Sequence, residues 1–243
     1  MTGANPNNDK VPSRICYDPP PDAKVTWGNL IRPNTKGTIH ACMKLKLDEQ
    51  MKGSLNFRLL LAFLTSNMEG LDLDDVMDGG DGPPEYPGKS PVDLVADYLS
   101  RVREHAWKDL EAQYGASTFE SMKKELVVTV PAVWSERAKD QTMKAVNRAK
   151  FQASKISLVT EPEAAAIYTL KTMMEGANRT ELQVGDVFVL TDCGGGTVDL
   201  ISYKITQVHP VFRVVEAAVG TGDKCGATYV DKVMTTYFAF ERA

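Results

Sequence analysis

The sequence predicts an α/β protein, and three observations support this fold class. From residue 125 onward, short runs rich in β-branched residues alternate with longer segments whose apolar residues recur every three or four positions. Capping and turn residues separate these segments. Further along, two strand-like runs enclose three consecutive glycines. A chain of 243 residues is long enough to bury a core in one large domain or two ordinary ones.

Composition and charge exclude several classes of protein. Apolar residues make up 43% and charged residues 25%, as in an ordinary globular protein. The net charge is -4, so we expect no nucleic-acid partner. The longest apolar run, Leu59–Leu64, is far shorter than the roughly 18 residues that cross a bilayer, so we expect no membrane partner. Four widely spaced cysteines without a C-x-x-C pair indicate a reducing, cytoplasmic location: Cys16, Cys42, Cys193 and Cys225.

The N-terminal third gives weaker signals. Residues 1–20 lack the apolar core of a secretory signal, and we expect a flexible arm there. Residues 12–38 are rich in proline and polar residues, which indicates extended segments joined by turns. Between residues 39 and 64 the apolar pattern fits either two helices or a strand and a helix.

Residues 72–88 concentrate acidic residues, glycines and prolines, which is typical of a surface loop. Four of them occupy positions of a calcium-binding EF-hand loop. Its third position, however, is Val76, which has no side-chain oxygen, and two prolines follow. We therefore interpret the segment as a loop and not as a calcium site. The four matching residues are Asp74, Asp78, Gly79 and Glu85.

A long helix is expected after the loop. Ser90 is a suitable N-cap, and Pro91 suits the first helical position. One apolar stripe runs along this segment and consists of Val95, Tyr98, Leu99, Val102, Ala106 and Leu110. None of the three histidines has neighbours that indicate a ligand role.

Strands and helices then alternate. We expect strands at 125–131, 156–159 and 186–192. Two more strands follow, and together with the strand at 186–192 they are expected to form a meander. Ser135 is expected to cap a helix whose narrow face suits packing on a sheet: Ala138, Thr142, Ala145, Val146 and Ala149. Residues 160–163 match a capping box at the start of another helix. A helical tail is expected at the C-terminal end.

The strongest chemical signal is the run from Asp192 to Asp199, in which Gly194, Gly195 and Gly196 are followed by Thr197. Glycines let backbone N–H groups approach an anion closely. A carboxylate at a strand end can hold a hydrated Mg²⁺ ion. The alternative is a tight hairpin that needs glycine only for its backbone angles. Three glycines between two aspartates exceed that need, so we favour a phosphate site.

Two other nucleotide motifs are set aside. The sequence contains no G-x-x-x-x-G-K-[ST] motif, which excludes a P-loop enzyme. Gly220, Gly222 and Gly226 only approximate a dinucleotide-binding fingerprint, since their spacing is G-x-G-x-x-x-G.

Three segments together resemble a known family: VVTVPAVWSERAKDQTMKAVNRAKF, LVTEPEAAAIYTL and VFVLTDCGGGTVDL. In this order and spacing they resemble the ATPase domain of the 70-kDa heat-shock protein chaperones, in the actin-like ATPase superfamily. The resemblance is specific from Glu125 to Asp231. It implies a ribonuclease-H-like actin/heat-shock ATPase fold that is incomplete, with most of lobe I and the start of lobe II. Residues 21–183 would form the lobe I-like region with a helical insertion, and 184–243 the start of lobe II with the phosphate-loop meander.

The resemblance also implies ATP and Mg²⁺ as cofactors, and protein clients or co-chaperones as partners. Asp192 would order the magnesium, with Asp199 binding a cation nearby, and Glu161 would lie beside the metal and the attacking water. Lys44 is our candidate for the lysine that positions the nucleophile, with Lys46 as a competitor. The nucleotide-binding residues would be Gly194, Gly195, Gly196, Thr197 and Gly226. Pro131 resembles the family's relay proline, although Lys139 stands where an arginine is usual.

Several departures from the family pattern bear on activity. No D-x-G-T hairpin precedes Pro12, Gly226-Ala227 replaces a Gly-Gly pair, and the family's adenosine-binding glycines do not follow. Phosphoryl transfer needs electrostatic contacts from several sides, so we expect weak ATP binding and weaker hydrolysis. Two alternatives stay open: a non-catalytic actin-like interaction module, and a sugar or acyl kinase of the same superfamily.

Overall fold

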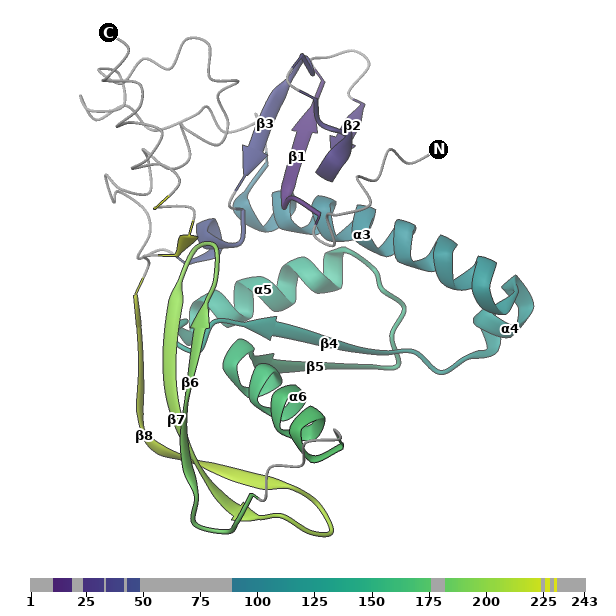
Figure 1. Ribbon diagram of the computed structural model, residues 1–243. Coiled ribbons are helices and arrows are strands. Elements are labelled where there is room, and N and C mark those ends of the chain that lie inside the picture. Colours follow the sequence, from purple (N-terminus) through teal and green to yellow (C-terminus); the bar gives the residue numbers. More distant parts are fainter. Residues whose placement is uncertain are drawn as a thin grey trace, which may run out of the picture. The chain divides into compact units, whose positions relative to one another are not determined.

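The computed structural model describes residues 11–18, 24–32, 34–41, 43–48, 89–175, 182–223, 226–227 and 230 (Figure 1). These residues form a mixed α/β structure, as predicted. The chain divides into unit 1, Met1–Lys124 with Ser135–Ala153, and unit 2, Glu125–Trp134 with Ser154–Ala243. The calcium-like loop, the apolar run at 59–64, Cys42, Cys225 and the expected C-terminal helix lie outside the described residues.

Unit 1 begins with a small antiparallel sheet. Its strands are β1 (Arg14–Tyr17), β2 (Val25–Trp27) and β3 (Thr38–Ala41), with β1 in the centre. Two short 3-10 helices follow β2 and β3: η1 (Gly28–Leu30) and η2 (Leu45–Leu47). The expected extended segments are thus confirmed, and β3 provides a strand in the region whose pattern left two possibilities open.

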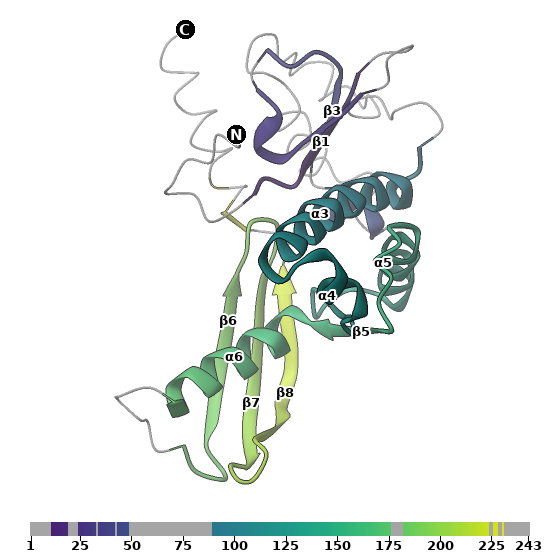
Figure 2. The same ribbon diagram turned by 90° about the vertical axis from the view of Figure 1, so that its right-hand side faces the viewer.

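The sheet of unit 1 packs against α3 (Pro91–Tyr114), as Figures 1 and 2 show. Ile15, Tyr17, Met43 and Leu94 form a buried apolar cluster at this contact. The stripe predicted for the helix is only partly buried, and the most buried side chains are Val92, Leu94 and Ala96 in its first turns. The reason is that the apolar cluster meets the beginning of the helix, whereas the later turns are partly open to water.

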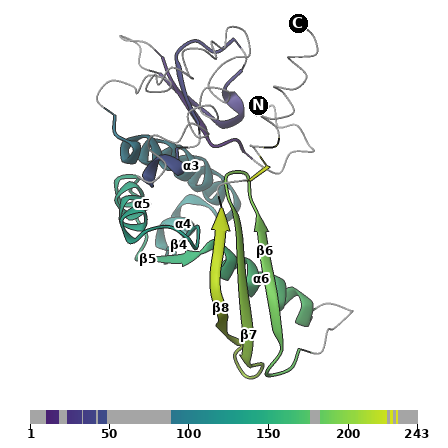
Figure 3. The same ribbon diagram turned by 90° about the vertical axis from the view of Figure 1, so that its left-hand side faces the viewer.

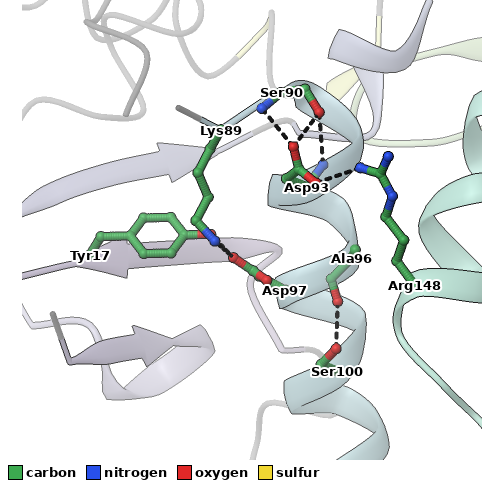
Figure 4. Close-up of polar contacts among 8 residues, drawn as sticks. All are labelled: Tyr17, Lys89, Ser90, Asp93, Ala96, Asp97, Ser100 and Arg148. Atoms are coloured by element: carbon green, nitrogen blue, oxygen red, sulfur yellow. Dashed lines mark hydrogen bonds and ion pairs between the residues drawn. The ribbon is translucent and has the colours of Figure 1, made fainter. Parts of the chain in front are cut away.

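The start of α3 is fixed by a capping box (Figure 4). The Asp93 amide donates to Ser90 Oγ at 3.3 Å, and the Ser90 amide donates to Asp93 Oδ2 at 3.0 Å. Hydrogen bonds from Ser90, together with nearby Arg148, hold the pKa of Asp93 below its usual value. One turn later, the Tyr17 hydroxyl donates to Asp97 at 2.7 Å, and Lys89 pairs with the same carboxylate. The predicted cap at Ser90 is therefore confirmed.

Helix α4 (Ala116–Ser121) follows α3, and α5 (Glu136–Arg148) completes unit 1. Ser135 caps α5 through a 3.2 Å bond from the Ala138 amide, as predicted. Within unit 1 α5 packs against α3, and the predicted packing on a sheet stays a prediction. The small-residue face is buried throughout, as expected: Ala138, Thr142, Ala145, Val146 and Ala149.

Among its described residues, unit 2 forms two sheets and the helix α6. Strands β4 (Glu125–Val130) and β5 (Lys155–Thr160) pair in parallel. Helix α6 (Glu161–Glu175) follows. Strands β6 (Val187–Cys193), β7 (Val198–Gln207) and β8 (Arg213–Asp223) form the predicted antiparallel meander.

Helix α6 covers one face of the meander (Figure 2), and Ala166, Leu170, Ile201 and Tyr203 form the buried cluster there. Within the described part of unit 2, no other element covers the opposite face (Figure 3). On that face the side chains of Val187 and Val189 are 59% and 66% exposed. None of the described helices is both long and apolar enough to cross a membrane.

Acid should destabilise unit 1 through His40 on β3. Its side chain is 2% exposed, stacks edge-on with Tyr17, and has no hydrogen-bond partner for Nε2 among the described residues. Burial first, and Lys46 second, lower the pKa of His40 to about 4. As the pH falls below about 6.5, the unfolded chain takes up a proton on this histidine that the folded chain does not. The free energy of unfolding is therefore highest above that pH and falls by roughly 2–3 kcal/mol as the pH approaches 4.

Urea unfolding at several pH values between 4 and 7 measures this effect. Subtracting the curve of His40→Phe isolates the contribution of this imidazole from that of the carboxylates. Identical pH profiles for the native chain and His40→Phe would show that the imidazole contributes nothing.

The end of α5 provides a second prediction. The Arg103 guanidinium donates to the carbonyls of Ala149 and Lys150, which closes the end of the helix. Lys150 has a φ of 56°, which strains a residue with a side chain. We expect Arg103→Met to lower the free energy of unfolding by about 1–3 kcal/mol, because charged hydrogen bonds are lost. Lys150→Gly should raise it by up to about 1 kcal/mol, because glycine relieves the strain. Thermal unfolding of both variants tests the two opposite signs.

Candidate functional site

The triple-glycine segment forms the bend between β6 and β7. The Gly194 amide donates to the Thr197 carbonyl at 3.0 Å, which closes the bend. Asp192 and Asp199 are direct partners across the two strands. Directly opposed residues in an antiparallel pair lie on the same face of the sheet. The sequence placed both carboxylates beside the glycines, and the strand register brings them together.

The two carboxylates differ in exposure. Asp192 is half-buried, whereas Asp199 is only 1% exposed. Thr197 is also buried. Burying a polar side chain costs free energy unless it is hydrogen-bonded, and burying a carboxylate costs more unless it is also paired. The bend thus lies beside one carboxylate that solvent can reach and one that is buried.

A second glycine segment packs directly on the bend. The Ala227 amide donates to the Gly194 carbonyl at 2.9 Å, and the Gly226 amide lies 3.4 Å from the Gly196 carbonyl. A Cβ atom on Gly226 would lie 2.5 Å from backbone atoms of Gly195. Only glycine permits this approach. The structure therefore brings Gly226 to the triple-glycine bend, although some thirty residues separate them in the chain.

Gly222 is a residue of this group that the sequence analysis did not assign. It is the register partner of Asp199 on β8. A Cβ atom there would lie 2.7 Å from the Asp199 carboxylate and 3.1 Å from Val133 in the turn after β4. A glycine inside a strand is a known sign of close approach, and that signal could have identified it.

Glu161 is the first residue of α6, in the same unit. The predicted capping box is confirmed: Glu163 accepts from the Thr160 amide at 3.0 Å, and the Glu163 amide donates to Thr160 Oγ1 at 3.3 Å. The helix start is therefore fixed, and Glu161 lies where the helix dipole favours a carboxylate. Lys44 lies in unit 1, directly before η2, so the group described in unit 2 does not include it.

A hollow of about 570 Å³ lies between α6 and β6 and reaches Asp192 at one end. Ala166, Leu170, Phe188 and Leu190 are among the side chains that line it. This lining suits apolar packing and not a phosphate chain. This hollow is therefore not a candidate for binding a phosphate chain.

Comparison with known proteins gives an independent view. No protein-family model matches the sequence. Heat shock 70 kDa protein 12B of Homo sapiens is 27% identical over 58% of this chain and 27% of its own length. The chaperone protein HscA homolog of Verminephrobacter eiseniae is 32% identical over 60% of this chain and 20% of its own length.

The chain is a relative of the 70-kDa heat-shock proteins. The resemblance seen in the sequence motifs is thereby confirmed. The relationship implies an actin-like ATPase fold, which agrees with the mixed α/β structure. The chain spans about a quarter of the length of heat shock protein 12B and a fifth of that of the HscA homolog.

The tight contact between the two glycine segments of this heat-shock relative can be tested by adding single methyl groups. Gly226→Ala and Gly222→Ala place a Cβ atom within 3 Å of neighbouring atoms, so each should lower the free energy of unfolding by about 1–3 kcal/mol. A Cβ atom at Gly194 would meet only the Thr197 carbonyl, at 3.2 Å, so Gly194→Ala is the milder control. Urea unfolding should rank Gly194→Ala well below the other two. Equal effects at all three positions would contradict the described packing.

Proposed function

We propose that this chain is an ATP-binding domain of a chaperone-like ATPase, and that the glycine bend in unit 2 binds the phosphates. The observation that most supports this proposal is the pair of opposed carboxylates, Asp192 and Asp199, beside a bend of three glycines. The relationship to heat-shock proteins supports the proposal.

The backbone of the bend suits an anion. Its carbonyls at Gly194 and Gly196 accept hydrogen bonds from the second glycine segment. Among the described residues, the amides of Gly195 and Gly196 donate to no backbone carbonyl. Consecutive amides without an internal acceptor form a concave site for phosphate oxygens. Thr197 extends this group with a hydroxyl, and Gly226 holds the bend in shape.

The carboxylates suit a hydrated magnesium ion. No group of three or more metal-binding side chains occurs among the described residues. This composition agrees with Mg²⁺, which keeps several waters and needs only one or two carboxylates beside substrate phosphates. Asp192, which solvent can reach, would orient those waters. Its buried partner across the strands, Asp199, would add negative charge beside it. When bound, the metal would neutralise the charge on the phosphates.

Further roles follow the family pattern. Glu161 would act near the attacking water, and Lys44 would position the nucleophile, with Lys46 as the alternative. We propose residues 21–183 as the lobe I-like region and 184–243 as the start of lobe II, after an N-terminal arm at 1–20. ATP hydrolysis would drive a conformational change that acts on protein clients or co-chaperones in the cytoplasm.

One observation favours the second candidate, a non-catalytic interaction module. Gly226 packs against Gly195 so closely that the two segments already support each other without a ligand. A structural hairpin could use its glycines for that contact alone. The two candidates differ in whether the bend binds nucleotide.

Calorimetric titration of Mg-ATP into the chain separates them. We expect micromolar binding, weakened at least tenfold by Asp192→Asn, because the carboxylate that orders the metal waters is lost. A tenfold loss corresponds to about 1.4 kcal/mol.

Asp140→Asn is the matched control, since Asp140 is an exposed carboxylate on α5 that pairs with Lys144. Its affinity for Mg-ATP should equal that of the native chain. Absence of heat at millimolar Mg-ATP would overturn the proposal and favour the interaction module.

A further inference from the structure

Unit 1 carries a groove that the proposed nucleotide site does not use. It lies between the β2–η1 segment and the middle turns of α3, and its volume is about 470 Å³. One wall comes from β2, η1 and the residues beside them, and the other from α3. The lining residues that matter are Trp27, Leu30, Arg32, Arg101, Glu104 and Lys108.

Trp27 provides a rigid aromatic surface in this groove. Its ring meets Tyr98 at 5.9 Å and His105 at 6.0 Å, both in edge-to-face geometry. Two apolar side chains on the groove are open to water, with Leu30 56% and Val11 49% exposed. Aromatic side chains held rigidly beside exposed apolar ones are typical of the centre of a binding surface.

The charges around the groove are mainly positive. Arg32, Arg101 and Lys108 line it, and Glu104 is the one carboxylate among the described residues of its lining. Glu104 already accepts from Arg101 at 2.9 Å and lies 3.6 Å from Arg103. Within the described ranges, neither Arg32 nor Lys108 forms an ion pair. A chain with a net charge of -4 thus presents a local cationic groove.

The spacing of the cations indicates the shape of a ligand. Arg101 and Lys108 are seven residues apart on α3, which places them about 10 Å apart along the helix axis. In an extended peptide, side chains two and four positions apart share a face, and the outer pair lies roughly 13 Å apart. A peptide with carboxylates four positions apart could therefore meet both long cationic side chains and place an apolar side chain between them on the same face.

We propose that this groove binds an acidic peptide segment of a partner protein, with a bulky apolar side chain against Trp27 and carboxylates on Arg32, Arg101 and Lys108. The positive charge of the groove favours the carboxylates of the peptide, and the ring of Trp27 favours its bulky apolar side chain. Electrostatic complementarity of this kind mainly sets partner choice and association rate. The groove is independent of the nucleotide proposal, since all its residues lie in unit 1.

The test uses the full chain and a fluorescein-labelled peptide, Glu-Ser-Phe-Ser-Glu, read by fluorescence anisotropy. The matched peptide Gln-Ser-Phe-Ser-Gln keeps the apolar side chain and removes the charges. We expect the acidic peptide to bind at least tenfold more tightly than the amide peptide. Raising the salt concentration from 50 to 500 mM should weaken the binding of the acidic peptide at least fivefold, because salt screens the exposed charges of the groove.

Protein variants then locate the site. Lys108→Glu and Arg32→Glu change exposed side chains, and each should weaken the binding of the acidic peptide at least fivefold. The matched control is Lys155→Glu, which changes an exposed lysine on β5 and should bind the peptide as the native chain does. Circular dichroism shows that each variant is folded. Trp27→Phe should retain most of the affinity, whereas Trp27→Ser, if folded, should lose it.

Three outcomes would overturn the proposal. The first is no binding of the acidic peptide at 1 mM. The second is equal binding of the two peptides, or affinity unchanged in both Lys108→Glu and Arg32→Glu. The third is tighter binding of a labelled oligo-dT strand than of the acidic peptide, which would assign the groove to nucleic acid.

Discussion

The close approach of two backbone segments in unit 2 determines the geometry of the candidate site. Gly226 lies against Gly195 at a distance that no side chain permits, and the Ala227 amide bonds to the Gly194 carbonyl. This contact occupies the carbonyl side of the bend. Among the described residues, the amides of Gly195 and Gly196 donate to no backbone carbonyl. In the proposed function the same glycines therefore serve packing through their carbonyls and phosphate binding through their amides.

Local signals in the sequence predicted local structure well. Three helix starts follow from a hydroxyl residue placed before the helix: Ser90, Ser135 and Thr160 each make the expected bond to a backbone amide. Such bonds form within three residues, so the sequence contains both partners. Alternation also predicted the three strands of the meander, and the three glycines mark the bend between β6 and β7. The end of β8 was not predicted, because Gly220 and Gly222 lie inside this strand and not after it.

Contacts between distant residues were harder to predict. The burial of α3 shifted toward Val92, Leu94 and Ala96 because the buried apolar cluster of unit 1 meets the first turns of the helix. Helical periodicity contains no information on what covers each turn. Gly222 was missed for a similar reason: its importance comes from Asp199 and Val133, which are distant in sequence. The groove around Trp27 combines β2, η1 and α3, and no local pattern links these three.

The last strand of the meander bears on how the chain behaves at high concentration. Among the described strands β8 is an edge, and it is eleven residues long. In the described part of the chain no strand pairs with the outer side of β8, and Val219 on this strand is 93% exposed. A long edge strand with apolar neighbours can recruit a strand from another molecule. Purified preparations should therefore self-associate through β8 as they are concentrated, and a lysine at position 219 would act as a gatekeeper against fibrous assemblies.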